Sequence, residues 1–224
     1  MKNLQKKFNT WIFDLDNTLY SAETGIFDQI DKLMGEFIST NLNVDMNEAK
    51  KLQKKYFKKH GTTLRGLMDN HNINPEDFLN EVHRIDYSII KPNLSLTNAL
   101  KKINGNKIIY TNANRSHVNA ILSRLELIDA FDNIFDITDA EYIPKPEISS
   151  YRELIKKFDV NTETTIMFDD IAKNLVPASK IGFTTVWIDI GRENYSDDIE
   201  NSKEYLDYQT TDLPLWLNSI IKEL

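Results

Sequence analysis

One short stretch near the start of the chain decides the fold: Trp11-Ile12-Phe13-Asp14-Leu15-Asp16-Asn17-Thr18-Leu19-Tyr20. An apolar run of strand length that ends at polar breakers predicts a buried strand, with Asp14 at its carboxyl end. In open parallel α/β sheets, ligands bind at that edge. Asn17-Thr18 indicates a turn that re-aims Asp16, so we expect the two carboxylates to converge near one point.

Two further polar features lie downstream of this stretch. The predicted strand Lys107–Thr111 ends in a hydroxyl and is followed by Asn112. A hydroxyl and the backbone N–H groups after it can hold phosphate oxygens without adding charge. Lys145 stands between two prolines, which keep it out of a helix. Taken alone, the first feature would more often be an ordinary turn and the second a solvated lysine.

An acidic pair, Asp169-Asp170, follows the apolar strand predicted at 165–168, and Asn174 comes four residues after the pair. Burying two carboxylates together without a cation would be costly. Mg²⁺ prefers carboxylate and water oxygens and commonly binds one or two carboxylates together with a substrate phosphate. The sequence therefore predicts a magnesium site at this edge of the sheet.

These four motifs, in this order, resemble those of the haloacid-dehalogenase-like (HAD) hydrolases. The resemblance implies an α/β fold with a doubly wound parallel sheet of strand order 5-4-1-2-3 and an inserted all-helical cap. It implies that Asp14 is a nucleophile that forms an aspartyl-phosphate and that Asp16 is the general acid and base. Asn174 is expected to orient its loop.

The resemblance also assigns residues to three roles. The implied catalytic residues are Asp14, Asp16, Thr111 and Lys145. The implied substrate-binding residues are Thr18, Thr111, Asn112 and Lys145. The implied Mg²⁺ ligands are Asp14, Asp16 through its backbone carbonyl, Asp170 and Asp169, of which Asp169 could instead lie behind the direct ligands.

Parts of the insert resemble one branch of the family, the pyrimidine 5′-nucleotidase-like proteins. The matching residues are Gly25-Ile26, Thr63-Leu64-Arg65-Gly66-Leu67 and His71. This likeness implies a Mg²⁺-dependent phosphomonoesterase acting on pyrimidine nucleoside 5′-monophosphates. Tyr110 and Ile171 depart from the usual pattern beside the second and fourth motifs, and both departures leave the residues of the chemistry intact.

Other functions remain open on the sequence. The chain could hydrolyse a flavin or sugar phosphate, or act as a phosphomutase. Asp16 argues against a dehalogenase, because that reaction has no ester oxygen to protonate. A phosphate-binding module without catalysis is the alternative from another class, and the presence of every motif residue argues against it.

The pattern of apolar residues divides the chain into two regions. Residues 22–92 read as an all-helical cap, and 1–21 with 93–224 as the catalytic core, where strands alternate with helices. Predicted cap helices cover 26–42 and 64–68 and begin at 45 and 74. Predicted core elements are helices at 96–103, 118–125, 150–158, 175–181 and 213–221 and strands at 134–137 and 184–188. Residues 192–207 are polar and are left unassigned.

Composition narrows the class of protein. The chain has 224 residues, 41% of them hydrophobic, a net charge of −7 and no cysteine. A soluble domain with a sizeable core is expected, acting on a small phosphorylated substrate as a monomer or homodimer. The negative charge argues against a nucleic-acid polymer as partner. Without a signal-length or membrane-length apolar run, we expect no membrane partner and a cytoplasmic location.

The histidines show no metal-ligand spacing, so a histidine metal site is not expected. They are His60, His71, His83 and His117. Of the charged cap residues, Arg65 and His71 could face the substrate, but a buried ion pair or a surface position suits each equally well.

Overall fold

A computed structural model describes residues 7–191 and 200–221. Six parallel strands form one sheet in the order β3-β2-β1-β4-β5-β6. They are β1 (Thr10–Phe13), β2 (Asn106–Tyr110), β3 (Asn133–Phe135), β4 (Thr165–Asp169), β5 (Thr184–Ile188) and β6 (Tyr208–Thr210). The predicted order of the first five strands is confirmed. β6 was not predicted and extends the sheet beyond β5.

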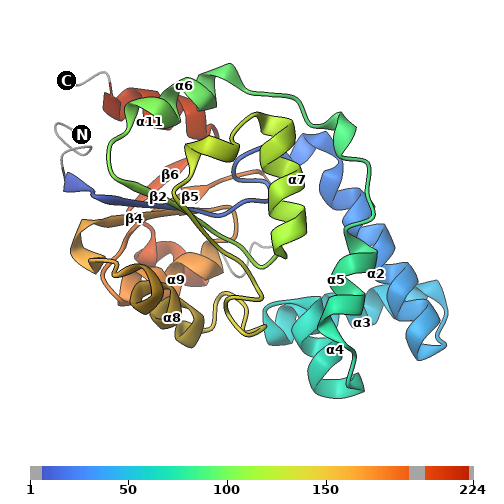
Figure 1. Cartoon of the computed structure of the whole chain (residues 1–224). Coiled ribbons are helices and arrows are strands. Elements are labelled where there is room, and N and C mark those ends of the chain that lie inside the picture. Colours follow the sequence, from blue (N-terminus) through green and yellow to red (C-terminus); the bar gives the residue numbers. More distant parts are fainter. Residues whose placement is uncertain (1–6, 192–199, 222–224) are drawn as a thin grey trace.

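Helices cover both faces of the sheet, as Figure 1 shows. On one face lie α6 (Leu94–Lys102), α7 (Arg115–Leu125) and α11 (Leu213–Ile221), and on the other α8 (Ile148–Phe158) and α9 (Ala172–Lys180). Side chains alternate along β1 and so enter the hydrophobic cores on both faces of the sheet. Phe13 packs in one core and Ile12 in the other. Phe13 stacks on Phe168 of β4 with ring centroids 4.7 Å apart. The doubly wound architecture is confirmed.

The predicted helices form, and several of them begin earlier than predicted. The Asn114 side chain accepts a hydrogen bond from the His117 N–H, so α7 begins at Arg115, before the predicted residue 118. The predicted helices at 96–103, 150–158 and 175–181 likewise begin earlier, as α6, α8 and α9. In the described part of the chain, every helix is too short or too polar to span a bilayer.

Residues 22–92 contain only helices and connecting turns. They are η1 (Ala22–Thr24), α2 (Ile26–Leu42), α3 (Met46–His60), α4 (Thr63–His71), α5 (Pro75–Val82) and η2 (Tyr87–Ile89). Asp45 caps α3 and Asn74 caps α5, as their positions predict. In Figure 1 the lower part of this insert, α3 to α5, projects away from the sheet. The division into catalytic core and cap stays a prediction.

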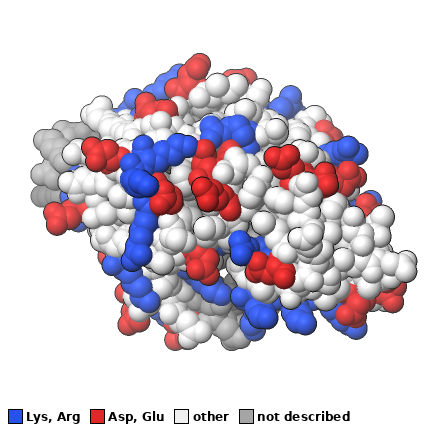
Figure 2. All heavy atoms as spheres, turned by 60° about the horizontal axis from the view of Figure 1, so that its bottom comes forward, with Lys and Arg blue, Asp and Glu red and all other residues white. Residues whose placement is uncertain are grey.

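The surface carries charges of both signs. Figure 2 shows acidic and basic side chains interspersed over the face that it presents. The six lysines of α3 are all exposed, which fits a solvated helix face. They are Lys50, Lys51, Lys54, Lys55, Lys58 and Lys59.

Strand register brings the motifs to one edge of the sheet. Phe13 pairs with Ile109 on one side and with Phe168 on the other. The N–H of Asp14 donates to the Phe168 carbonyl at 2.9 Å, so Asp14 continues the ladder beyond β1. The residues that follow β1, β2 and β4 therefore lie side by side, which is where the site is built.

Candidate active site

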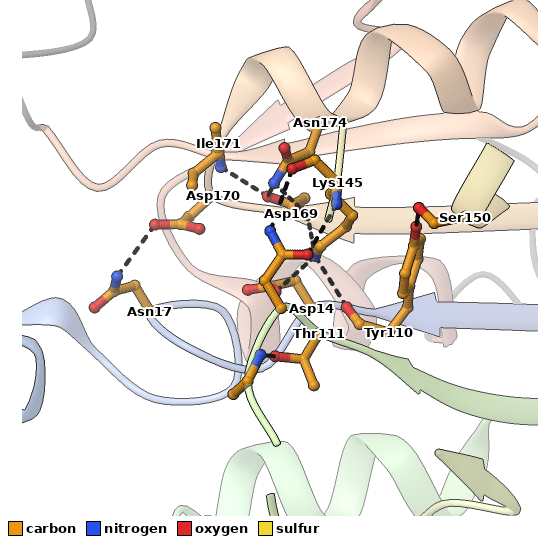
Figure 3. A network of polar contacts seen from close by, with 12 residues as sticks. Asp14, Asn17, Tyr110, Thr111, Lys145, Ser150, Asp169, Asp170, Ile171 and Asn174 are labelled. Carbon is orange, nitrogen blue, oxygen red and sulfur yellow. Dashed lines mark hydrogen bonds and ion pairs between the residues drawn. The ribbon is translucent and has the colours of Figure 1, made fainter. Parts of the chain in front are cut away.

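Asp14 lies at the centre of a buried polar network (Figure 3). Its side chain is 10% exposed, and its Oδ1 accepts a hydrogen bond of 2.7 Å from Lys145 Nζ. In the described part of the chain its second oxygen, Oδ2, carries no hydrogen bond. Burial raises the pKa of Asp14 to about 7; the Lys145 charge opposes this and the Asp169 charge adds to it. A further cation would keep this carboxylate ionised.

Lys145 is held in place by hydrogen bonds from all three protons of its ammonium group. The group is 1% exposed and donates to Asp14 Oδ1 and Asp169 Oδ2, each at 2.7 Å, and to the Tyr110 carbonyl at 2.9 Å. Burial lowers the pKa of Lys145, but the Asp14 and Asp169 carboxylates outweigh burial and hold it above its usual range. Because all three protons are used, a direct bond from Lys145 to a phosphoryl oxygen requires one of them to be exchanged.

The two residues of the acidic pair differ in their surroundings. Asp169 is fully buried, and its Oδ1 accepts from the Ile171 N–H at 2.9 Å and from Asn174 Nδ2 at 3.0 Å, while its Oδ2 accepts from Lys145. The Asp170 carboxylate accepts only from Asn17 Nδ2, at 3.2 Å, among the described residues. Asp170 thus has more free lone pairs for a cation, and Asp169 is committed to holding Lys145 and its own loop.

Three carboxylates gather within reach of one cation. Asp14, Asp169 and Asp170 each offer an oxygen, and these oxygens all lie within 4.8 Å of one another. Burial raises the pKa of Asp170 well above its usual range, and the charge of Asp14 adds to the effect. Within the described ranges, Lys145 is the only lysine that pairs with these carboxylates. This set of hard oxygen ligands could hold Mg²⁺, and the cluster contains no histidine.

Asp16 faces away from this cluster. Its Oδ1 accepts hydrogen bonds from His117 Nε2 at 2.7 Å and from the Tyr20 hydroxyl at 2.5 Å. Burial raises the pKa of Asp16, but His117 and the two hydrogen bonds outweigh burial and hold it below its usual range. The two motif aspartates therefore point to different partners, and a metal contact from Asp16 would have to come from its backbone carbonyl, as the resemblance implies.

The residues implied to bind phosphate differ in whether their side chains already have hydrogen-bond partners. Thr111 is 2% exposed, and its hydroxyl oxygen accepts from the Ala113 N–H at 3.0 Å, which leaves its proton free to donate. The Thr18 hydroxyl is buried without a hydrogen-bond partner among the described residues. The Asn112 side chain instead bonds both the N–H and the carbonyl of Lys145, so it fixes the Lys145 loop. A substrate contact from Asn112 is left to its backbone.

The sequence matches the family described as haloacid dehalogenase-like hydrolase over residues 8–182. The chain belongs to this family. It is 26% identical over 190 residues to phosphate metabolism protein 8 of Saccharomyces cerevisiae, covering 77% of this chain and 59% of that protein. It is 25% identical over 227 residues to glyceraldehyde 3-phosphate phosphatase of Methanocaldococcus jannaschii, covering 95% of this chain and 96% of that one.

Solved structures share the fold of this HAD hydrolase. A HAD phosphatase from Thermococcus onnurineus superposes with a TM-score of 0.62 at 18% identity, covering 96% of this chain and 98% of that one. L-2-haloacid dehalogenase from Xanthobacter autotrophicus superposes with a TM-score of 0.60 at 14% identity, covering 95% and 98%. Because both phosphatases and dehalogenases appear at similar scores, the fold alone does not choose between these reactions.

The insert of this HAD hydrolase touches the core beside Lys145. A Cβ atom built on Gly61, in the turn between α3 and α4, would lie 3.0 Å from the Lys145 carbonyl oxygen. Gly61 also has a φ of +82°, which glycine adopts without strain. The α3–α4 turn therefore packs directly on the loop that carries the lysine.

His71, one of the insert residues considered for substrate contact, is engaged within the insert. Tyr56 is 5% exposed and its hydroxyl bonds His71 Nε2, so this pair belongs to the packing of the insert. A Cβ on Gly66 would come within 2.3 Å of Tyr56, so the two helices require a glycine there. Arg65 is 37% exposed and pairs with Asp69 at 2.9 Å, which leaves part of its guanidinium open to solvent.

Proposed function

We propose that this HAD-family hydrolase is a Mg²⁺-dependent phosphomonoesterase that forms an aspartyl-phosphate on Asp14. The observation that carries the proposal is the arrangement of Asp14, with one oxygen fixed by Lys145 and the other free, beside Asp170 in a three-carboxylate cluster. Such a cluster fits a divalent cation, which when bound would supply positive charge to the phosphoryl oxygens.

The residues of the chain divide the reaction between them. Asp14 Oδ2 forms a bond to phosphorus as the bond to the ester oxygen breaks, and Asp16 gives its proton to that oxygen. Asp16 then removes a proton from water, the water oxygen attacks phosphorus, and the bond from phosphorus to Asp14 breaks to release phosphate. A phosphate dianion beside Asp16 raises its pKa by charge repulsion, which favours the protonated form needed first.

The remaining residues bind the phosphoryl group or hold other residues of the site in position. Lys145 lowers the pKa of Asp14, which favours its ionised form, and offsets the charge of the incoming phosphate. The free proton of the Thr111 hydroxyl and the unpartnered Thr18 hydroxyl are suited to donate to phosphoryl oxygens. Asp169 and Asn174 fix the lysine and the acidic loop from behind.

A dehalogenase is the main rival reaction, since dehalogenases share the fold. The buried three-carboxylate cluster favours the phosphatase, because its charge calls for a cation. Asp16 favours it too: it is fixed by two hydrogen bonds and is not needed where no ester oxygen leaves. A module that binds phosphate without catalysis would have no use for a nucleophile with a free oxygen.

For the substrate we propose pyrimidine nucleoside 5′-monophosphates, on the likeness of the 63–67 segment and His71 to that branch of the family. A small sugar phosphate is the second candidate. It is favoured by the full-length likeness to the glyceraldehyde 3-phosphate phosphatase of Methanocaldococcus jannaschii. The chain spans only 59% of the length of the yeast relative. The same core chemistry would also serve a flavin phosphate as substrate or a phosphomutase reaction.

A panel assay tests the proposal. Phosphate release is measured with and without Mg²⁺ on UMP, CMP, glyceraldehyde 3-phosphate, FMN, a hexose phosphate and p-nitrophenyl phosphate, and 2-chloropropionate is tested for chloride release. Mg²⁺-dependent phosphate release with UMP or CMP fastest supports the whole proposal. A preference for glyceraldehyde 3-phosphate would move the substrate to the second candidate, and chloride release without phosphate release would refute the phosphatase.

A further inference from the structure

A partly buried hydrogen-bonded chain connects the carboxylate of Asp16 to the segment that returns from the insert to the core, residues 83–93. His117, at the start of α7, is fully buried. Its Nε2 lies 2.7 Å from Asp16 Oδ1, and its Nδ1 lies 3.0 Å from the Tyr87 hydroxyl. The Tyr87 hydroxyl in turn donates to the His83 carbonyl at 3.1 Å.

The imidazole has little freedom to move. The His83 ring stacks on it with centroids 4.2 Å apart and an interplanar angle of 22°. The backbone N–H of His117 is fixed by the Asn114 side chain at the first turn of α7. Both ring nitrogens are engaged, so the ring is fixed in position and in rotation, and with it the oxygen of Asp16 that it contacts.

We propose that His117 positions Asp16 for proton transfer and that Tyr87, from the returning segment, holds the imidazole in place; this rests on the proposed phosphatase function. A general acid acts only within hydrogen-bond reach of its target, so geometry comes before pKa. Asp16 lies in a turn, where its side chain could adopt other rotamers, and His117 with Tyr20 selects one of them. His117 does not touch the substrate in this proposal and is a positioning residue.

The arrangement also couples the insert to the chemistry. Tyr87 and His83 belong to the segment that follows α5, whereas Asp16 and His117 belong to the core. A shift of the returning segment would move the Tyr87 hydroxyl away from His117 and loosen Asp16. The acid would then be in place only with the returning segment seated as it is in this structure.

A matched pair of variants tests the proposal. His117→Gln places an amide nitrogen near the position of Nε2 and can still donate to Asp16, whereas His117→Asn reaches only to the position of Nδ1. Both are polar and both keep a hydrogen-bonding group in the buried site. Tyr87→Phe is a third variant, which removes the hydroxyl behind the imidazole and keeps the ring. Each is checked for folding by circular dichroism and thermal melting.

The readout is the dependence on the leaving group, measured as kcat/KM with saturating Mg²⁺. The alkyl substrate is whichever of UMP and glyceraldehyde 3-phosphate the wild type hydrolyses faster; its leaving alkoxide needs a proton. p-Nitrophenyl phosphate releases a stable anion and needs none. We expect His117→Asn to lower kcat/KM for the alkyl phosphate by about 10-fold to 100-fold and for p-nitrophenyl phosphate by less than about 3-fold.

The variants separate positioning from structure. His117→Gln should recover the alkyl activity to within about 5-fold of wild type, and Tyr87→Phe should show the same substrate split to a smaller degree. If His117→Asn does not fold, the test uses Tyr87→Phe: a larger loss of kcat/KM on the alkyl phosphate than on p-nitrophenyl phosphate would support the proposal. Equal losses on both substrates, or no loss, would overturn the proposal while leaving the phosphatase intact. A wild type that releases phosphate from no monoester would instead overturn the proposed function, and this inference with it.

Discussion

Replacing Lys145 by methionine tests how far one cation holds the site together. Methionine keeps the length of the side chain but removes the charge that bonds Asp14 and Asp169 at 2.7 Å each. Removing one partner of a buried ion pair costs about 3–5 kcal/mol, because the other charge stays buried without compensation. Lys145 is 1% exposed and serves two carboxylates, so we expect the upper half of that range in metal-free protein.

The loss of stability caused by Lys145→Met should grow as the pH rises. The pKa of Asp14 is already raised to about 7 from 3.8, so its contribution to stability is fully present below about pH 4 and is lost as pH rises to about 7. Without Lys145 that pKa rises further. The destabilisation should therefore be larger at about pH 8 than at about pH 5, where the carboxyls can take up protons.

Urea unfolding in excess chelator at these two pH values measures the effect. Lys156→Met is the matched control, since that side chain is 81% exposed and its loss should change stability by less than about 0.5 kcal/mol. Asp16, whose pKa is shifted the other way, is unchanged in every protein and cancels from the comparison. A Lys145→Met protein as stable as the control, or equally destabilised at both pH values, would refute the reasoning.

Three further predictions concern the metal, the phosphate and the substrate. Asp170→Ala should abolish the rise in melting temperature on adding Mg²⁺ and with it the activity that chelation removes reversibly; full activity in excess chelator would exclude the metal. Thr111→Val should lower kcat/KM about 100-fold on UMP and p-nitrophenyl phosphate alike, and a loss on only one of them would contradict a shared phosphate contact. Arg65→Ala should change the UMP to p-nitrophenyl phosphate ratio, because the core groups meet only the phosphate; equal loss on both would remove selectivity from the insert.

The sequence predicted the sheet well because its buried strands are continuous apolar runs with polar residues at their carboxyl ends. β6 was not predicted because Tyr208, Gln209 and Thr210 are partly or fully exposed at the edge of the sheet and carry no apolar signal. Among the described strands it pairs with β5 alone, and the Thr210 carbonyl accepts from the Asp189 N–H beyond β5. The position of β6 therefore depends on its pairing with β5 rather than on the pattern of apolar residues in its own sequence.

The site was predictable where it lies at strand ends and unpredictable where it depends on distant contacts. The sequence placed Asp14, Asp169 and Asp170 together, and the structure brings them within reach of one ion. It gave no sign of the bond between Asp16 and His117, which joins residues 101 positions apart. The sequence analysis considered His117 only as a metal ligand, and its contact with Asp16 joins α7 to the loop after β1.

The contacts of the Asn112 side chain were unpredictable for a similar reason. The resemblance implies that Asn112 binds substrate, and this stays a prediction. In the fold its side chain is taken up by the backbone of Lys145, 33 residues away, which no local pattern reveals. Tyr56, which has the size of a substrate-facing aromatic residue, is instead packed within the insert.

The most direct test of the central claim is to look for phosphate on Asp14. Enzyme is mixed with the best monoester carrying labelled phosphate, in Mg²⁺, and quenched in acid within the first turnover. Wild type should carry an acid-stable, base-labile label that maps to the peptide containing Asp14, while Asp14→Asn should stay folded and carry none. Unlabelled wild type that nevertheless releases phosphate, or Asp14→Asn with normal turnover, would contradict the account.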